Sequence, residues 1–153
     1  MIELTKIFMA YAEAFEQTYI DDDWTRLQSY FAEDATYEVR GGPLACKLEG
    51  RDAILKGLKR SVDTLDRRCD DRKIDVTSAP EFSSVDEGDQ LSIDWYVSYQ
   101  YKDAPRAGFP GRSVATVADG VIIALRDEYS DEKMKPFIDW MAQYGNDLDG
   151  AYV

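Results

Sequence analysis

One carboxylate interrupts an apolar row in the segment DGVIIALRDEYSD, which begins at residue 119. If this segment is a β-strand, alternate side chains face the same way, and Asp127 falls in a row that otherwise belongs to a core. Burial in an apolar pocket raises the pKa of a carboxyl group, which suits it to general acid–base catalysis near neutral pH. The alternative is a structural carboxylate that reaches solvent or accepts a backbone hydrogen bond. The other members of the row are Val121, Ile123, Leu125 and Tyr129.

The chain contains no histidine, and this absence narrows the possible chemistry. Ser-His-Asp and Cys-His nucleophile systems are excluded, as are metal sites with histidine ligands. Proton transfer must therefore come from carboxylates, tyrosine, lysine or cysteine, and we expect neither a metal nor an organic cofactor. The two cysteines, Cys46 and Cys69, are expected to be free thiols, which is typical of a cytoplasmic protein.

Composition predicts one globular domain spanning residues 1–153. Hydrophobic residues make up 44% of the chain, which is enough for a substantial core, and the net charge is −12. A surface this acidic repels nucleic acid and anionic lipid, so neither is an expected partner. No apolar run is long enough to span a bilayer, and the first residues lack the pattern of a signal peptide.

Hydrophobic periodicity predicts helices and strands in an order typical of an α+β protein. We expect a curved antiparallel sheet with helices packed on one face. The expected helices are 3–20, a short helix from Trp24 to Phe31, 52–67 and 132–145. The run Asp21–Asp23 is expected to cap the short helix. The apolar positions of the last helix are Met134, Phe137, Ile138 and Met141. The expected strands are 35–40, 72–85, 89–102, 112–118 and 121–130. Pro80 interrupts the second of these strands, which indicates a position at the edge of the sheet. A tight turn is expected at Asp119-Gly120, and loops are expected over 41–50 and 104–111.

The strand at 89–102 has the clearest alternation in the chain. One row, which includes Trp95 and Val97, faces the core or a cavity lined by the same residue types. The other row is polar and faces water or a partner chain. Asp94 lies in this polar row, so it is expected to be solvated or at an interface rather than to act as a second acid.

Three segments carry a resemblance to a known superfamily: YFAEDATYEV at 30–39, GRDAI at 50–54, and the segment ending in DEYSD. In this order and spacing they resemble nuclear-transport-factor-2-like proteins over residues 5–131. Within that superfamily the sequence is most similar to SnoaL-like polyketide cyclases and limonene-epoxide hydrolases. The resemblance implies a cone-shaped, cystatin-like roll that encloses a deep apolar pocket.

The resemblance also implies roles for individual residues. In both families an aspartate near the end of the last strand reaches into the pocket as acid or base, and Asp127 aligns with it. A tyrosine of the epoxide hydrolases aligns with Tyr37, which is therefore a candidate pocket hydroxyl. The expected pocket walls are Phe15, Tyr19, Val39, Trp95, Val97, Leu125 and Tyr129.

Other residues of those families are missing. An epoxide hydrolase of this type needs an arginine, a second aspartate and an asparagine, where this chain has Trp95, Val97 and Val39. The ketosteroid isomerases of this fold use a tyrosine and two aspartates, where this chain has Phe15, Val39 and Val114. Neither of these two activities is expected.

Three functional hypotheses follow from the resemblance. The first is a small enzyme that uses Asp127 in an isomerase, cyclase or hydrolase reaction on an apolar or polyketide-like molecule. The second is a non-catalytic module that binds a small apolar ligand. The third is a structural subunit of a larger enzyme, as in the small subunits of ring-hydroxylating dioxygenases. The polar face carrying Tyr96 and Ser98 further predicts a homodimer.

Overall fold

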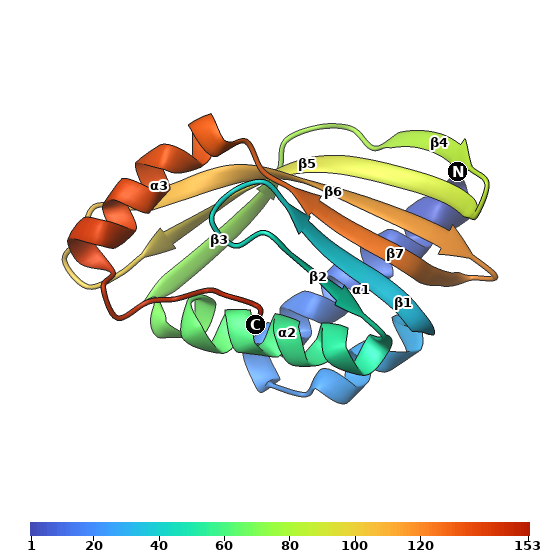
Figure 1. Cartoon of the computed structure of the whole chain (residues 1–153), viewed down its shortest axis with the longest axis horizontal. Coiled ribbons are helices and arrows are strands. Elements are labelled where there is room, and N and C mark those ends of the chain that lie inside the picture. Colours follow the sequence, from blue (N-terminus) through green and yellow to red (C-terminus); the bar gives the residue numbers. More distant parts are fainter.

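The computed structural model describes residues 1–153 and confirms the α+β fold class. A seven-stranded curved sheet arches over the helices (Figure 1). The helices are α1 (Ile2–Asp21), α2 (Arg51–Thr64) and α3 (Asp131–Tyr144), with 3-10 turns at Trp24–Tyr30 and Asp66–Arg68. The strands are β1 (Phe31–Arg40), β2 (Cys46–Glu49), β3 (Asp71–Val76), β4 (Glu81–Val85), β5 (Gly88–Gln100), β6 (Ala107–Ala118) and β7 (Val121–Glu128). None of the helices combines the length and the apolar character needed to cross a membrane.

The sheet is mixed rather than wholly antiparallel. Its strand order is β2-β1-β7-β6-β5-β3, and β1 and β7 run parallel while the other pairs are antiparallel. The chain leaves β1 and the edge strand β2, builds the far side of the sheet, and returns with β7 beside β1 and parallel to it (Figure 1). This closure brings Tyr37 and Asp127 onto neighbouring strands.

Four strand assignments differ from the sequence prediction. Strand β1 begins at Phe31, which the prediction placed in a short helix, rather than at residue 35. The region 72–85 forms two separate strands, β3 and β4, which pair with different halves of the long strand β5 on the same side. The predicted loop at 41–50 contains β2, and β6 begins at Ala107, inside the predicted loop at 104–111. Pro110 is tolerated within β6 even though a proline nitrogen cannot donate a ladder hydrogen bond.

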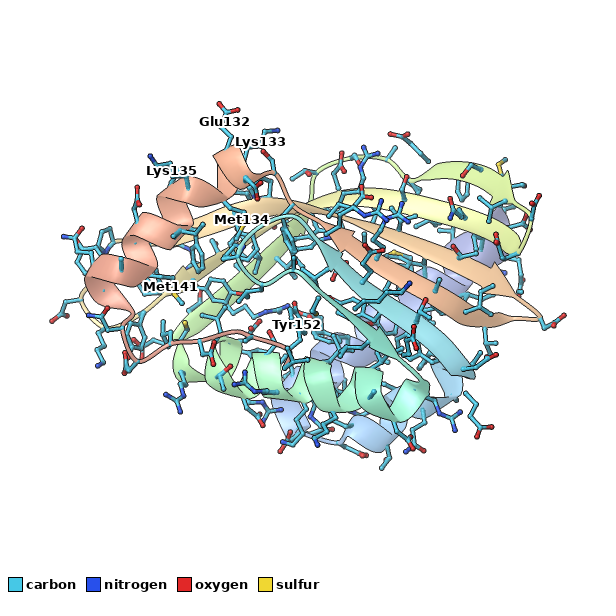
Figure 2. The ribbon with its side chains drawn as sticks, in the orientation of Figure 1. Glu132, Lys133, Met134, Lys135, Met141 and Tyr152 are labelled. Carbon is cyan, nitrogen blue, oxygen red and sulfur yellow. The ribbon has the colours of Figure 1, made fainter.

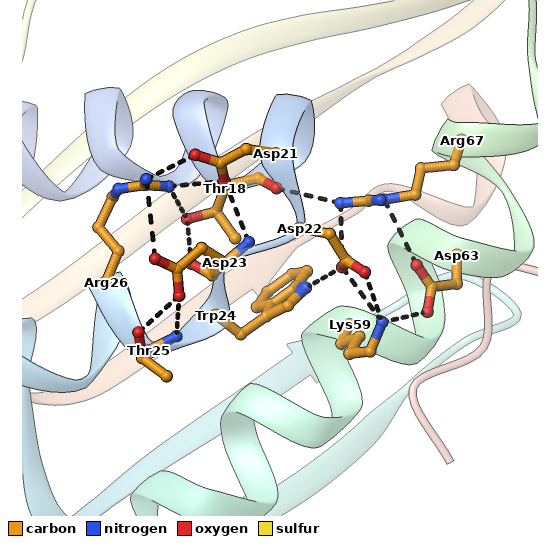
Figure 3. Close-up of polar contacts among 10 residues, drawn as sticks. All are labelled: Thr18, Asp21, Asp22, Asp23, Trp24, Thr25, Arg26, Lys59, Asp63 and Arg67. Carbon is orange, nitrogen blue, oxygen red and sulfur yellow. Dashed lines mark hydrogen bonds and ion pairs between the residues drawn. The ribbon is translucent and has the colours of Figure 1, made fainter.

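A polar network joins the end of α1 to α2 (Figure 3). Asp22 ends α1 in a left-handed conformation, and its carboxylate accepts hydrogen bonds from the Trp24 indole nitrogen at 2.7 Å and from Lys59 Nζ at 3.1 Å. Asp23 accepts from the Thr25 amide at 3.2 Å and caps the following 3-10 turn, as predicted. The network links the C-terminal end of α1 to α2.

Helix α3 covers the far end of the same sheet face. Figure 2 shows Met134 and Met141 on its inner side, with Glu132, Lys133 and Lys135 directed outward. Phe137 and Trp140 are also buried, whereas Ile138 is 39% exposed. The sequence prediction was therefore wrong to count Ile138 among the inward positions, and it omitted Trp140.

A β-bulge in β7 changes which side chains face the helices. Val117 pairs with Ile122, but the next pair is Thr116 with Ala124, so Ile123 is an extra residue in β7. Ile122 consequently points inward and is fully buried, and Leu125 and the positions beyond it keep the inward face. The predicted row is thus correct from Leu125 onward and wrong for Val121 and Ile123.

Candidate active site

An apolar cavity of about 250 Å³ lies between the concave face of the sheet and helices α1 and α2. Of its 31 lining residues, 21 are hydrophobic, so a bound molecule would meet mostly aliphatic and aromatic surface. The volume corresponds to about eight water molecules at their volume in the liquid. A small organic molecule of compatible shape can therefore be enclosed.

Asp127 lies in the wall of this cavity and is held by two hydroxyl groups. On β1, the residue paired with Asp127 is Val39. Tyr37 lies two residues before Val39 on the same face, and its long side chain reaches along that face to donate a hydrogen bond to Asp127 Oδ2 at 2.6 Å. On the other side, Ser113 of β6 is paired directly with Asp127 and donates to Oδ1 at 2.6 Å. Each carboxylate oxygen thus accepts one short hydrogen bond, and the orientation of the group is fixed.

The Ser113 hydroxyl is itself oriented by Trp95. The Trp95 indole nitrogen donates to Ser113 Oγ at 2.9 Å, so the hydroxyl hydrogen is left to point at Asp127. The indole can occupy this place only because its strand partner is Gly111, where an added Cβ would lie 2.5 Å from the indole ring. A glycine on β6 therefore indirectly positions the carboxylate.

Burial raises the pKa of Asp127 above its ordinary value of 3.8, although the hydrogen bonds from Ser113 and Tyr37 act in the opposite direction. The pKa of Tyr37 is also raised, by burial first and by the nearby negative charge of Asp127 second. Tyr37 therefore stays protonated as a donor. Such a carboxyl group can exchange a proton with a bound molecule at a pH closer to neutrality than an exposed aspartate can.

The structure places most of the predicted site residues around the cavity. Tyr19 and Val39 are the exceptions. Val39 is buried within the main core, and the Tyr19 ring lies against the guanidinium of Arg72, 5.0 Å from its carbon to the ring centre. The predicted residues that line the cavity are Phe15, Tyr37, Trp95, Val97, Leu125, Asp127 and Tyr129.

The sequence prediction missed Ser113 as a partner of Asp127. The resemblance pointed to Val114 as the residue facing the site, but Val114 pairs with Arg126 and is absent from the cavity wall. The bulge at Ile123 shifts the register by one residue and brings Ser113 opposite Asp127. A β-bulge in a short hairpin has no reliable sequence signal, so only the structure could assign this partner.

Tyr152 is a second residue that sequence reasoning missed. It lies near the end of a segment that returns from α3 along α2, and Figure 2 shows it directed into the space between α2 and the sheet. Its ring centre is 5.5 Å from that of Tyr37, and it lines the cavity. Burial and the charge of Asp127 raise the pKa of Tyr152 to about 12. The cavity wall next to the carboxylate is therefore completed by a protonated phenol.

Hydrogen bonds to α2 hold this segment in place. Ser61 Oγ donates to the Gly150 carbonyl at 2.6 Å, and the Gly150 amide donates to Thr64 Oγ1 at 3.0 Å. Arg60 Nη1 donates to the Ala151 carbonyl at 2.7 Å.

Nowhere in the chain do three or more Cys, Asp or Glu side chains converge in a way that could hold a metal ion.

Comparison of the sequence with known protein families gives one match. A family described as the SnoaL-like domain matches residues 10–125, a range that stops just before Asp127. No curated protein sequence matches the chain.

Solved structures share the fold at low sequence identity. A protein from Xanthomonas campestris that carries the provisional name polyketide cyclase is 20% identical, with a TM-score of 0.56 over 92% of this chain and 98% of its own. A nuclear-transport-factor-2-like protein of unknown function from Exiguobacterium is 20% identical, with a TM-score of 0.58 over 82% of this chain and 98% of its own. A protein from Catenulispora acidiphila with a ketosteroid isomerase-like fold, solved with trimethylamine, is 18% identical, with a TM-score of 0.57 over 92% of this chain and 94% of its own.

At these identities the solved structures establish the fold and nothing more. They agree with the arched sheet and the helices on one face, and therefore with the cone-shaped architecture of nuclear-transport-factor-2-like proteins. The sequence match spans more than half of the chain and includes β1, which carries Tyr37. The chain therefore belongs to the SnoaL-like domain family, and its fold is the one seen in nuclear-transport-factor-2-like proteins.

Proposed function

We propose that this protein is an enzyme that encloses a small apolar molecule and uses Asp127 as a general acid or base on it. The observation that carries the proposal is a single carboxyl group, buried in an apolar cavity and oriented by the Tyr37 and Ser113 hydroxyls at 2.6 Å each. Proton transfer of this kind serves isomerase, cyclase and hydrolase reactions alike. An apolar or polyketide-like substrate fits the lining.

Two alternatives remain distinct from this proposal. In a binding module, Asp127 would only orient a small ligand and no turnover would follow. In a structural subunit, the cavity would be incidental and the chain would copurify with a larger enzyme from its host. The raised pKa of Asp127 is consistent with acid–base chemistry, but burial would raise it in a binding module as well, so turnover is what separates the two.

A proton-abstraction probe tests the proposal without knowledge of the natural substrate. The probe is 5-nitrobenzisoxazole: a base removes the proton at C3, the electron pair of that C–H bond forms the nitrile, and the N–O bond breaks to leave a coloured phenolate. We expect the wild-type protein to accelerate this reaction above an equal concentration of acetate. Asp127→Asn should lower the rate by about 10²–10⁴-fold, the range for loss of a general acid or base.

Asp94→Asn is the matched control. Asp94 is also a strand carboxylate, but it is absent from the cavity wall and Arg112 Nε donates to it at 2.7 Å. Its replacement should leave the rate unchanged. A wild-type rate no higher than that of acetate, or an undiminished rate in Asp127→Asn, would contradict the proposal.

The pocket does not carry the charged residues of a limonene-epoxide hydrolase at the expected positions. Trp95 and Val97 line the cavity where the arginine and second aspartate would lie. We therefore expect no hydrolysis of simple terpene oxides. Diol formation that depends on Asp127 would refute this expectation.

We further propose that the protein is a homodimer. Tyr96 is 40% exposed on β5, on the face of the sheet that the helices leave uncovered, and Ser98 follows on the same face. A partner sheet could pack on this moderately polar surface. A mass measurement in solution at micromolar concentration should give twice the 17.4 kDa of the chain, and the monomer mass alone would contradict the proposal.

A further inference from the structure

The charged side chains Arg72, Asp66 and Glu16 also line the cavity, away from Asp127. Arg72 of β3 donates from Nε to Asp66 at 2.5 Å and from Nη1 to Glu16 of α1 at 2.7 Å. Its side chain is only 6% exposed, and it shares one face of β3 with Ile74, which also lines the cavity. None of the reasoning about Asp127 accounts for a buried arginine at this position.

One nitrogen of this guanidinium has no partner within the protein. Arg72 Nη2 donates no hydrogen bond, in contrast to Nε and Nη1. It is not among the fully enclosed side-chain nitrogens that lack a partner, so it keeps some accessible surface, and Arg72 is one of the residues that line the cavity. A buried donor left without an acceptor costs free energy, and a ligand oxygen placed against Nη2 would remove that cost.

The charge of Arg72 is already matched. Glu16 and Asp66 both contact the guanidinium, and their charges raise the pKa of Arg72 although burial alone would lower it. An anionic ligand group placed here would meet the carboxylates that are paired with the arginine. A neutral oxygen acceptor avoids this repulsion and still satisfies Nη2.

Arg72 and Asp127 lie on different walls. In the sheet, β5 and β6 separate β3 from β7. Three strand steps of about 4.8 Å separate the two backbones across the sheet. Arg72 pairs with Tyr99 of β5, whereas Asp127 lies level with Ile93, and these six residues add about 20 Å along the strands. An oxygen bound at Arg72 is therefore remote from the reacting atoms and anchors the molecule rather than stabilising charge that develops at Asp127.

We infer that the ligand of this cavity is an elongated apolar molecule with a neutral oxygen acceptor, such as a ketone carbonyl, at the end that binds Arg72. The inference rests on the proposed function only in placing the ligand in the same cavity. It adds the substrate class: an apolar compound with a neutral oxygen acceptor rather than a pure hydrocarbon or a carboxylic acid. Specificity then comes from Arg72 and proton transfer from Asp127.

Three naphthalenes of similar shape test the inference by equilibrium binding in a calorimeter. 2-Acetylnaphthalene carries the neutral acceptor, 2-isopropylnaphthalene replaces its oxygen with a methyl group, and 2-naphthoate carries an anion. We expect wild-type protein to bind the ketone about tenfold tighter than the hydrocarbon, as for a hydrogen bond to a charged donor, and tighter than the acid. Equal affinity for ketone and hydrocarbon, or tightest binding of 2-naphthoate, would overturn the inference.

Two variants locate the effect at Arg72. Arg72→Lys keeps a cation for Asp66 and Glu16 but lacks the planar group that presents Nη2, so the preference for the ketone should fall to about threefold or less. Glu16→Gln removes one of the matching charges from a half-exposed position and should improve 2-naphthoate binding relative to the ketone by about twofold to fivefold. If Arg72→Lys does not fold, as judged by thermal unfolding, Glu16→Gln decides the question alone.

Asp94→Asn should leave all three affinities unchanged. An unaltered ratio of 2-naphthoate to ketone affinity in Glu16→Gln would overturn the inference. None of these measurements involves turnover. Failure here therefore differs from failure of the proposed acid–base function, which is measured as the rate with 5-nitrobenzisoxazole in Asp127→Asn.

Discussion

Replacing Asp127 with asparagine is expected to leave the free energy of unfolding at pH 7 unchanged or to raise it. The substitution keeps the shape of the side chain and removes the ionisable proton. In the wild-type protein the carboxyl group is buried in an apolar wall, and burial outweighs two short hydrogen bonds, because its pKa is raised overall. The ionised form is thus less favourable in the folded protein than in the unfolded chain.

The magnitude follows from two opposing effects. An asparagine can still accept from one hydroxyl, but its amide group meets the other, so about one hydrogen bond worth roughly 0.5–1.5 kcal/mol is weakened. Against this, each increase of one in the pKa of Asp127 corresponds to about 1.36 kcal/mol of destabilisation once the group is ionised. The two effects are of similar size even for a modest rise in the pKa of Asp127. The free energy of unfolding of Asp127→Asn is therefore expected to equal or exceed that of wild type.

The dependence on pH gives the sign of the effect independently. A carboxyl group whose pKa is raised on folding contributes stability below its unfolded value of 3.8, and that contribution is lost as the pH rises through the folded pKa. Asparagine has no such dependence. The unfolding free energy of Asp127→Asn minus that of wild type should therefore increase from about pH 4 toward neutrality and then level off.

Denaturant unfolding of both proteins at a series of pH values measures this difference, since all other titrating groups cancel. A loss of about 1–3 kcal/mol in Asp127→Asn at pH 7 would show that the carboxylate is a structural acceptor. A difference that declines with rising pH would show that the folded protein favours the ionised form. Either result would refute the reasoning that places a functional acid in this cavity.

Further predictions concern the residues around the carboxyl group. Ser113→Ala removes a donor that lowers the pKa of Asp127, so the pH–rate profile with 5-nitrobenzisoxazole should shift to higher pH; an unshifted profile would contradict the assigned hydrogen bond. Gly111→Ala places a Cβ 2.5 Å from the Trp95 indole. This substitution should lower the free energy of unfolding by about 1–3 kcal/mol and change the tryptophan fluorescence. Wild-type values for both would show that the indole has room to move. Tyr152→Phe keeps the ring beside Tyr37 and should change the unfolding free energy by less than about 1.5 kcal/mol, while Tyr152→Ala should cost more because it leaves a cavity in the wall. Equal costs for the two Tyr152 variants would show that the ring does not pack there.

The sequence predicted the elements of the fold well because hydrophobic periodicity determines most of them. The alternation in β1 correctly placed Tyr37 and Val39 on the buried face, and the Asp119-Gly120 turn is present with both residues at positive φ, as a tight hairpin requires. The direction of pairing between β1 and β7 was not predictable in the same way. It depends on how the chain closes the sheet, which no local pattern specifies.

The candidate site was predictable only in part, because its residues meet through tertiary structure. Asp127 was predicted because it interrupts an apolar row along one strand and also aligns with the pocket aspartate of the families that the sequence resembles. Ser113 was missed because the bulge at Ile123 shifts the register of β7 by one residue and so brings Asp127 opposite Ser113. Arg72 and Glu16 were missed because they lie on elements far apart in the sequence, and each alone reads as an ordinary surface charge.

The hydrogen bond between Tyr37 and Asp127 also has a consequence for how the protein folds. The two residues are 90 positions apart, and the strands that carry them become neighbours only when the chain returns to its first strand. Ordering so long a loop precedes any gain from the contact, so this pairing is expected late in folding and slowly. Until then the edge of β1 stays open to other chains. Ligand binding at the cavity is thus a reporter of complete folding, since a partly folded intermediate that lacks the β1–β7 pair has no site to occupy.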